Sequence, residues 1–111
     1  MNNFNEQQVL RDMLNASQIK AGAVWNQAKD DIKEEFKVLV NVGGRIVARK
    51  GEGTITEVNA RFLIAQYYGA MRSYLYSLEG IANLILESII NAALGVLRDA
   101  IKVATNGWIL I

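Results

Sequence analysis

The sequence predicts an all-α protein: a long antiparallel helical hairpin, coiled-coil-like, in one domain that spans residues 1–111. Three observations lead to this fold class. Apolar residues recur at a mean step of roughly 3.7 residues over much of the chain, which is the helical period. Helix-capping signals stand at the ends of two long segments, and the chain contains no Pro. The one clear turn, residues 50–54, is short and therefore places the two helices side by side and antiparallel.

The first helix is expected from about residue 6 to about residue 49. Asn5 can act as its N-cap, and Gln8 at the third helical position completes a capping box. Phe4 and Val9 flank this cap as a hydrophobic staple. Beyond the staple, apolar or small residues follow one face of the helix, and Lys, Arg and Asn follow the opposite face. If this helix breaks internally, the expected places are residues 15–17 and 43–44.

A short β-hairpin over residues 36–50 is the alternative for the end of the first helix. This segment is rich in β-branched residues, and Gly43 and Gly44 fit a two-residue hairpin turn. A hairpin would give neither face of the ribbon a clean apolar surface, whereas a helix separates the apolar and polar residues better. We therefore expect a helix there.

The second helix is expected from about residue 55 to about residue 105. Thr54 and Glu57 form its capping box, Asn106 and Gly107 are a C-cap signal, and the tail at 107–111 is apolar. Two helices of this size would be roughly 65 to 75 Å long at about 1.5 Å per residue. Such lengths indicate an assembly subunit, a coiled coil or a membrane span rather than a compact enzyme.

The second helix has more apolar surface than one neighbouring helix can cover. Its polar residues follow a narrow stripe that includes Glu79, Asn83, Glu87 and Asn91, and the rest of its circumference is apolar. The first helix has one apolar stripe and can cover about one flank, so we expect the other flank and the tail to associate with another molecule. The expected interface residues are Leu75, Leu78, Ile81, Ile85, Ile89, Ile90, Val96, Leu97, Trp108, Ile109, Leu110 and Ile111.

Residues 73–97 also suggest a membrane-inserting segment. This stretch contains only two charged residues, Glu79 and Glu87, and is long enough to span a bilayer. Its apolar residues contribute about −5 kcal/mol to insertion, and the carboxylates, Asn and Ser residues cancel that gain. A single span is therefore marginal, whereas an oligomeric bundle with the polar stripe inward could insert.

The composition removes most catalytic chemistry. The chain has neither His nor Cys, so the commonest general base, metal ligand and thiol nucleophile are absent. Glu79 and Glu87 lie roughly 12 Å apart along a helix, too far apart for paired acid–base work. We expect no enzyme activity and no catalytic, metal or cofactor-binding residues. Four basic residues cluster at the expected hairpin tip, either as a solvated end or as a contact for an acidic partner: Arg45, Arg49, Lys50 and Arg61.

These observations predict a structural subunit that self-assembles into a homo-oligomeric ring, tube, filament or capsid-like shell. The alternatives are a membrane-active oligomer that binds lipid and a helical adaptor that binds another protein. A net charge of +1 argues against a nucleic-acid partner, and nothing indicates a small-molecule substrate. The N-terminus lacks an apolar run behind a basic stretch, so we expect synthesis in the cytoplasm and assembly there, in a particle or at a membrane.

Overall fold

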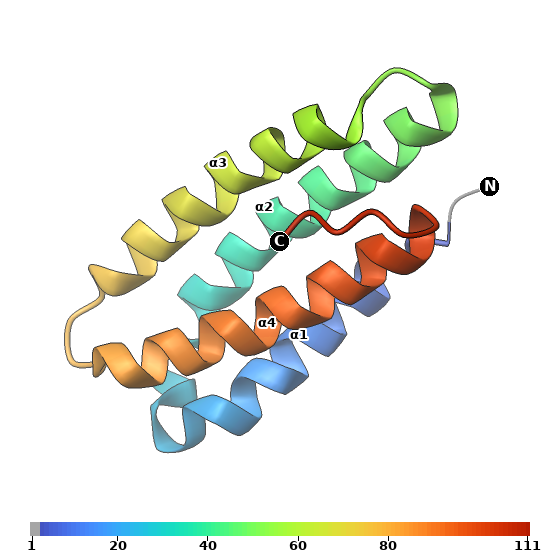
Figure 1. Cartoon of the computed structure of the whole chain (residues 1–111). Helices are drawn as coiled ribbons and strands as arrows, with labels where there is room; N and C mark the ends of the chain where they lie inside the picture. The colour runs from blue at the N-terminus through green and yellow to red at the C-terminus, as the bar shows by residue number, and fades with distance from the viewer. Residues whose placement is uncertain (1–2) are drawn as a thin grey trace.

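A computed structural model describes residues 3–111, which form four helices joined in an antiparallel bundle (Figure 1). α1 (Glu6–Ala21) is followed by a one-turn 3-10 helix, η1 (Gly22–Val24), and then by α2 (Trp25–Glu52). α3 (Glu57–Tyr76) and α4 (Asn83–Ala104) complete the bundle. α1 packs most extensively on α4, and α2 lies beside both α1 and α3. The all-α prediction is confirmed.

The first predicted helix is divided, and its two parts fold back on each other. Gly22 has φ 56° and ψ −127°, a backbone conformation that residues with a Cβ avoid, and it ends α1. The chain reverses through η1, so α2 runs antiparallel to α1 (Figure 1). The uninterrupted helix over 6–49 is therefore wrong. Both expected break points, residues 15–17 and 43–44, are helical instead.

The glycine pair in α2 serves close packing rather than a turn. A Cβ added to Gly43 would lie 3.0 Å from Cζ of Phe4, and one added to Gly44 would lie 2.5 Å from Oε2 of Glu6. The start of α1 therefore approaches the α2 backbone directly at these two positions. Residues 36–50 lie wholly within α2, so the β-hairpin alternative is wrong.

The second predicted helix is also divided. α3 ends at Tyr76, Gly80 adopts φ 82°, and α4 begins at Asn83. Nε2 of Gln27 donates a hydrogen bond to the Glu79 carbonyl at 3.3 Å, which ties this turn to the start of α2. Residues 73–97 thus comprise the end of α3, a turn and part of α4, rather than one helix. Across residues 3–111, no helix has the length and apolar character needed to cross a membrane.

The helix caps agree in part with the predicted signals. The Asn5 side chain accepts a hydrogen bond from the Gln8 backbone at 3.0 Å, which confirms the first cap. α3 is capped by Thr56, which accepts from the Asn59 backbone at 3.1 Å, and not by Thr54. The Thr54 hydroxyl donates to the Arg49 carbonyl at the end of α2, because Gly53 closes that helix in the left-handed conformation.

Folding each long segment in half gives the single chain an enclosed core. The bundle measures 44 × 23 × 19 Å, well below the length expected of an open hairpin. Each of the four helices contributes side chains that are fully or almost fully buried, among them Met13, Phe36, Leu39, Ile64, Met71, Leu86 and Leu97. Most of the apolar residues expected to drive assembly are therefore buried within one molecule.

Candidate interaction surface

Most of the predicted interface lies inside the molecule. Six of its residues are buried within their own chain: Leu75, Ile81, Ile89, Ile90, Leu97 and Leu110. Five more are half-buried and packed against the core: Leu78, Ile85, Val96, Trp108 and Ile111. The prediction is wrong for the six buried residues, because other parts of the same chain cover them. On α4, for example, α1 and the α2–α3 pair cover the flanks that an open hairpin would expose. Ile109 alone remains largely exposed, at 49%.

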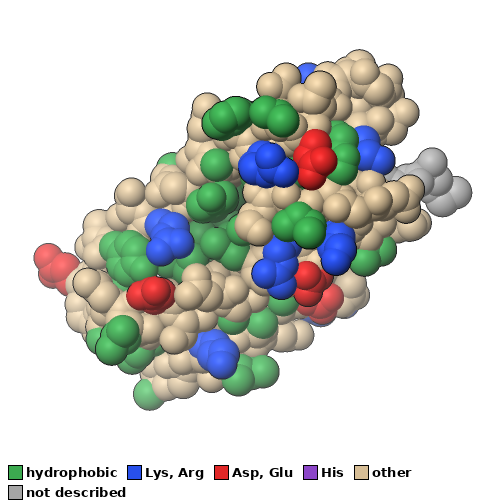
Figure 2. Space-filling view, in the orientation of Figure 1, with side chains coloured by type: hydrophobic (Ala, Val, Ile, Leu, Met, Phe, Trp, Pro, Cys, Tyr) green, Lys and Arg blue, Asp and Glu red, His purple; other side chains and the backbone are tan. Residues whose placement is uncertain are grey.

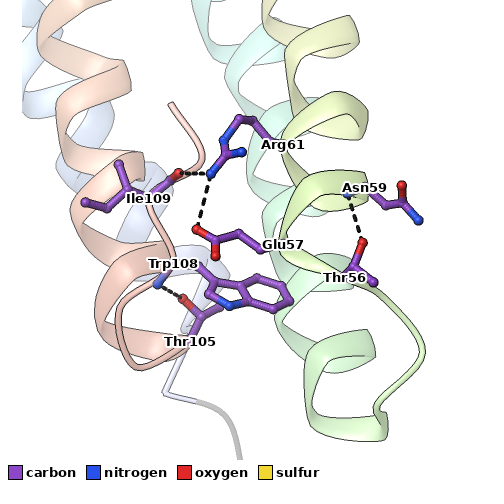
Figure 3. A network of polar contacts seen from close by, with 7 residues as sticks. All are labelled: Thr56, Glu57, Asn59, Arg61, Thr105, Trp108 and Ile109. Atoms are coloured by element: carbon purple, nitrogen blue, oxygen red, sulfur yellow. Dashed lines mark hydrogen bonds and ion pairs between the residues drawn. The ribbon is translucent and has the colours of Figure 1, made fainter.

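The apolar tail docks on its own chain. We define residues 105–111 as the C-terminal strap, which turns back after α4 and runs between α3 and α4 (Figure 1). The reversal uses Asn106 at φ 57° and Gly107 at φ 120°. The buried Thr105 hydroxyl donates to the Ile101 carbonyl at 2.6 Å and accepts from the Trp108 backbone at 3.1 Å. These bonds fix the start of the strap (Figure 3).

Two basic residues from α2 and α3 hold the rest of the strap. Nζ of Lys50 lies 5.2 Å from the centre of the Trp108 ring, a cation–π distance. Nη2 of Arg61 donates to the Ile109 carbonyl at 3.4 Å and pairs with the Glu57 carboxylate at 3.2 Å (Figure 3). Leu110 is only 3% exposed, so the strap fills space that would otherwise leave core residues open to water.

The basic tip is therefore largely a structural feature. Lys50 and Arg61 contact the strap, and Nη2 of Arg49 donates to the Thr54 carbonyl at 2.9 Å. The Arg45 side chain is exposed on α2 and makes no hydrogen bond or ion pair with residues 3–111. The structure does not gather the four cations into one free basic surface.

The polar stripe lies in water. Glu79 in the α3–α4 turn and Asn83, Glu87 and Asn91 along α4 are all exposed. The stripe residues on α4 therefore form the side of that helix that faces solvent. Within the described part of the chain, no group of three or more acidic residues is placed to hold a metal ion.

The outer side of α3 carries few charged residues. Only four of its twenty residues are buried, and the only charged side chains along it are Glu57, Arg61 and Arg72. We define the α3 face as the residues that share its outward side: Val58, Phe62, Ala65, Gln66, Gly69 and Ser73. Figure 2 shows hydrophobic side chains gathered along the edge of the molecule that α3 forms.

Three members of the α3 face are unusual for a solvent surface. Phe62 is 66% exposed, with Val58 one turn before it at 54%. Gly69 lies in the middle of α3, and a Cβ added to it would meet nothing within 4 Å. A helical Gly costs about 1 kcal/mol relative to Ala, and packing within the chain does not require it here. This face could not be predicted from the sequence, because the uncharged run over residues 62–71 resembles a buried helix until α3 is known to lie on the outside of the bundle.

Comparisons with protein-family models, with curated proteins and with solved structures found no match for this chain.

Proposed function

We propose that this protein is a structural subunit that self-associates by packing the α3 face of one copy against the α3 face of a second. The observation that carries this proposal is the exposure of Phe62, at 66%, on an uncharged stretch of helix. Aromatic residues are enriched at the centres of protein interfaces, and charged residues are depleted there. On α4 the exposed large apolar residues are Leu84 and Val103, which lie at opposite ends of the helix, roughly 28 Å apart at about 1.5 Å per residue. Phe62 and Val58 are one turn apart on α3, so the α3 face offers the more continuous apolar surface for association.

The composition of the α3 face also suits close helix contact. Ala65, Gly69 and Ser73 are small and recur every four residues, so they lie along one line of the helix. Small side chains let two helix backbones approach closely, while Phe62 and Val58 supply apolar area beside them. Because the two surfaces are identical, the contact would be two-fold symmetric.

The expected strength of this contact follows from its size. A stable interface buries roughly 1,200 to 2,000 Å² in total, so the contact must extend along most of the roughly 30 Å of α3. Full burial of a Phe side chain contributes about 1.5 to 3 kcal/mol, and association costs at least about 4 kcal/mol in lost freedom. Phe62 and Val58 from both copies therefore decide whether association is favourable, and the dimer should depend on protein concentration.

Replacing Phe62 by Asp tests the proposal. The Phe62→Asp variant should be monomeric by light scattering at concentrations where the wild-type chain is dimeric or larger, because each copy would lose its largest apolar contact and bury a carboxylate instead. Phe62 is already largely in water, so the helical circular dichroism should stay unchanged.

Ile19→Asp is the matched control, because Ile19 is 80% exposed on α1 and lies outside the α3 face. It should retain the wild-type mass. The proposal is wrong if the wild-type chain is monomeric throughout, if Phe62→Asp keeps the wild-type mass, or if both variants dissociate equally. A monomeric wild type would favour the adaptor alternative, in which another protein's helix covers the α3 face.

A two-fold contact through the α3 face produces a dimer and stops there. A ring, tube or filament needs a second, different contact on each subunit.

A further inference from the structure

We infer that the C-terminal strap is an exchangeable arm, and that the α3–α4 groove accepts the strap of a second copy as well as its own. This inference rests on the proposed self-association and supplies the second contact that a larger assembly needs. The occupant of the groove is thus residues 108–111 of another copy of this chain.

The groove is built to hold this segment. α3 and α4 make little direct contact, and the strap runs between them (Figure 1). Leu110 is buried there, and Trp108 and Ile111 pack partly against the core. An identical strap from a second copy would make the same contacts, so exchange loses no interaction outside the hinge.

Beyond the hinge, where Thr105 accepts a hydrogen bond from the Trp108 backbone, the polar contacts that hold the strap are few and lie at the surface. The Arg61 bond to the Ile109 carbonyl is 3.4 Å long, beyond the usual 2.7–3.2 Å range, and the cation–π contact of Lys50 adds no hydrogen bond. Release of the strap therefore requires mainly the temporary exposure of the core residues beneath it and of three apolar side chains: Trp108, Leu110 and Ile111.

The closed position of the strap depends on the two residues that form its hinge. Asn106 and Gly107 both have positive φ, at 57° and 120°, and this pair turns the strap back onto its own chain. Gly107 tolerates φ 120°, whereas a β-branched residue there is strained. A Cβ at Gly107 would meet nothing within 4 Å, so a substitution acts on the backbone conformation and not through a clash.

The length of the strap limits how two copies can meet. Five residues, 107–111, span at most roughly 18 Å when extended. The donor and acceptor grooves must therefore lie close together, at the end of the bundle where α4 ends and α3 begins. Reciprocal exchange closes a dimer, and one-way exchange from copy to copy forms an open chain.

A hinge variant should drive exchange. Gly107→Val strains the closed turn and should lower the dissociation constant of the exchanged oligomer at least about tenfold, measured by light scattering over a dilution series. Removing residues 108–111 from this variant should abolish the gain. Gly51→Val is the matched control, because Gly51 is exposed in α2 with no atom near an added Cβ and no positive φ.

A second measurement tests strap exchange even if the truncated chain fails to fold. In a Trp25→Phe background, Trp108 is the single fluorescent Trp. Gly107→Val should keep blue-shifted emission while oligomeric, with the strap seated in a second copy, and shift to the red on dilution. Red-shifted emission at every concentration would mean that the strap is merely released, and would overturn the inference. A monomeric Gly107→Val with blue-shifted emission would overturn it as well.

A double variant separates this inference from the α3 contact. Gly107→Val with Phe62→Asp should still oligomerise through the strap, although the α3 face is disrupted. If Phe62→Asp alone is monomeric and Gly107→Val has no effect on mass, the α3 contact stands and strap exchange is wrong. If the double variant oligomerises and Phe62→Asp alone has the wild-type mass, strap exchange stands and the α3 contact is wrong.

Discussion

Tyr74 joins α3 to α2 through one polar contact at the surface. Its hydroxyl donates a hydrogen bond to Oδ1 of Asp31 at 2.8 Å. This hydrogen bond is the main cause that raises the pKa of Tyr74, followed by the negative charge of Asp31, partial desolvation and the charge of Glu35. Deprotonation of the phenol would remove the donor and place two negative charges side by side. The contact therefore depends on pH.

The sign of this dependence follows from the direction of the shift. A folded-state pKa above the unfolded one means that the contact stabilises the fold below about pH 10, and that this contribution is lost as pH rises through the folded-state pKa. The Tm difference between wild type and Tyr74→Phe should be constant from about pH 6 to about pH 9 and should shrink above about pH 10. A difference that stays constant into the alkaline range would contradict this account.

At the scale of the helix, local signals predicted where elements begin better than where they break. The Asn5 cap and the turn near residue 53 could be predicted, because each uses a residue type with a strong local preference. The choice of a helix rather than a β-hairpin for residues 36–50 could also be predicted, because the apolar face of α2 has a helical period.

The two internal breaks could not be predicted from the same signals. Gly22 stands in a helical pattern that continues on both sides, and helices tolerate single glycines. At residues 77–82, Leu78, Ile81 and Ala82 continue the helical spacing of the apolar residues, and only Gly80 marks the turn. In both places the gain from enclosing a core exceeds the local preference for continued helix, and that gain depends on residues far away in the sequence.

Gly22 is the residue on which the first reversal depends. Gly22→Ala should destabilise the protein by about 1 to 2 kcal/mol, because Ala at φ 56° and ψ −127° is strained although no atom lies near its Cβ. Thermal unfolding at one fixed protein concentration measures the loss. Gly51→Ala is the control and should stabilise by about 0.5 to 1 kcal/mol, since Gly51 lies in a helix. Equal effects of the two substitutions would show that the reversal does not depend on Gly22.

At the scale of the whole molecule, the error in the predicted interface has one source. The excess apolar surface was counted for two uninterrupted helices, which can cover each other only along one stripe. Four shorter helices surround a common interior, so Ile89, Ile90 and Leu97 have neighbours on several sides. The surface that remains for association is smaller and lies elsewhere, on the α3 face and at the strap.

Disulfide trapping tests the α3 contact most directly, because the chain has no Cys and each introduced thiol is unique. Gly69→Cys places one at the middle of the α3 face, and Ser88→Cys places one on the exposed side of α4. A disulfide requires Cβ atoms roughly 3.5 to 4.5 Å apart, so only a close α3–α3 contact readily joins the introduced thiols of two Gly69→Cys chains. We expect mild oxidation to convert Gly69→Cys to a covalent dimer much faster than Ser88→Cys. Equal rates, or no dimer from Gly69→Cys, would contradict the proposal that this protein associates through the α3 face.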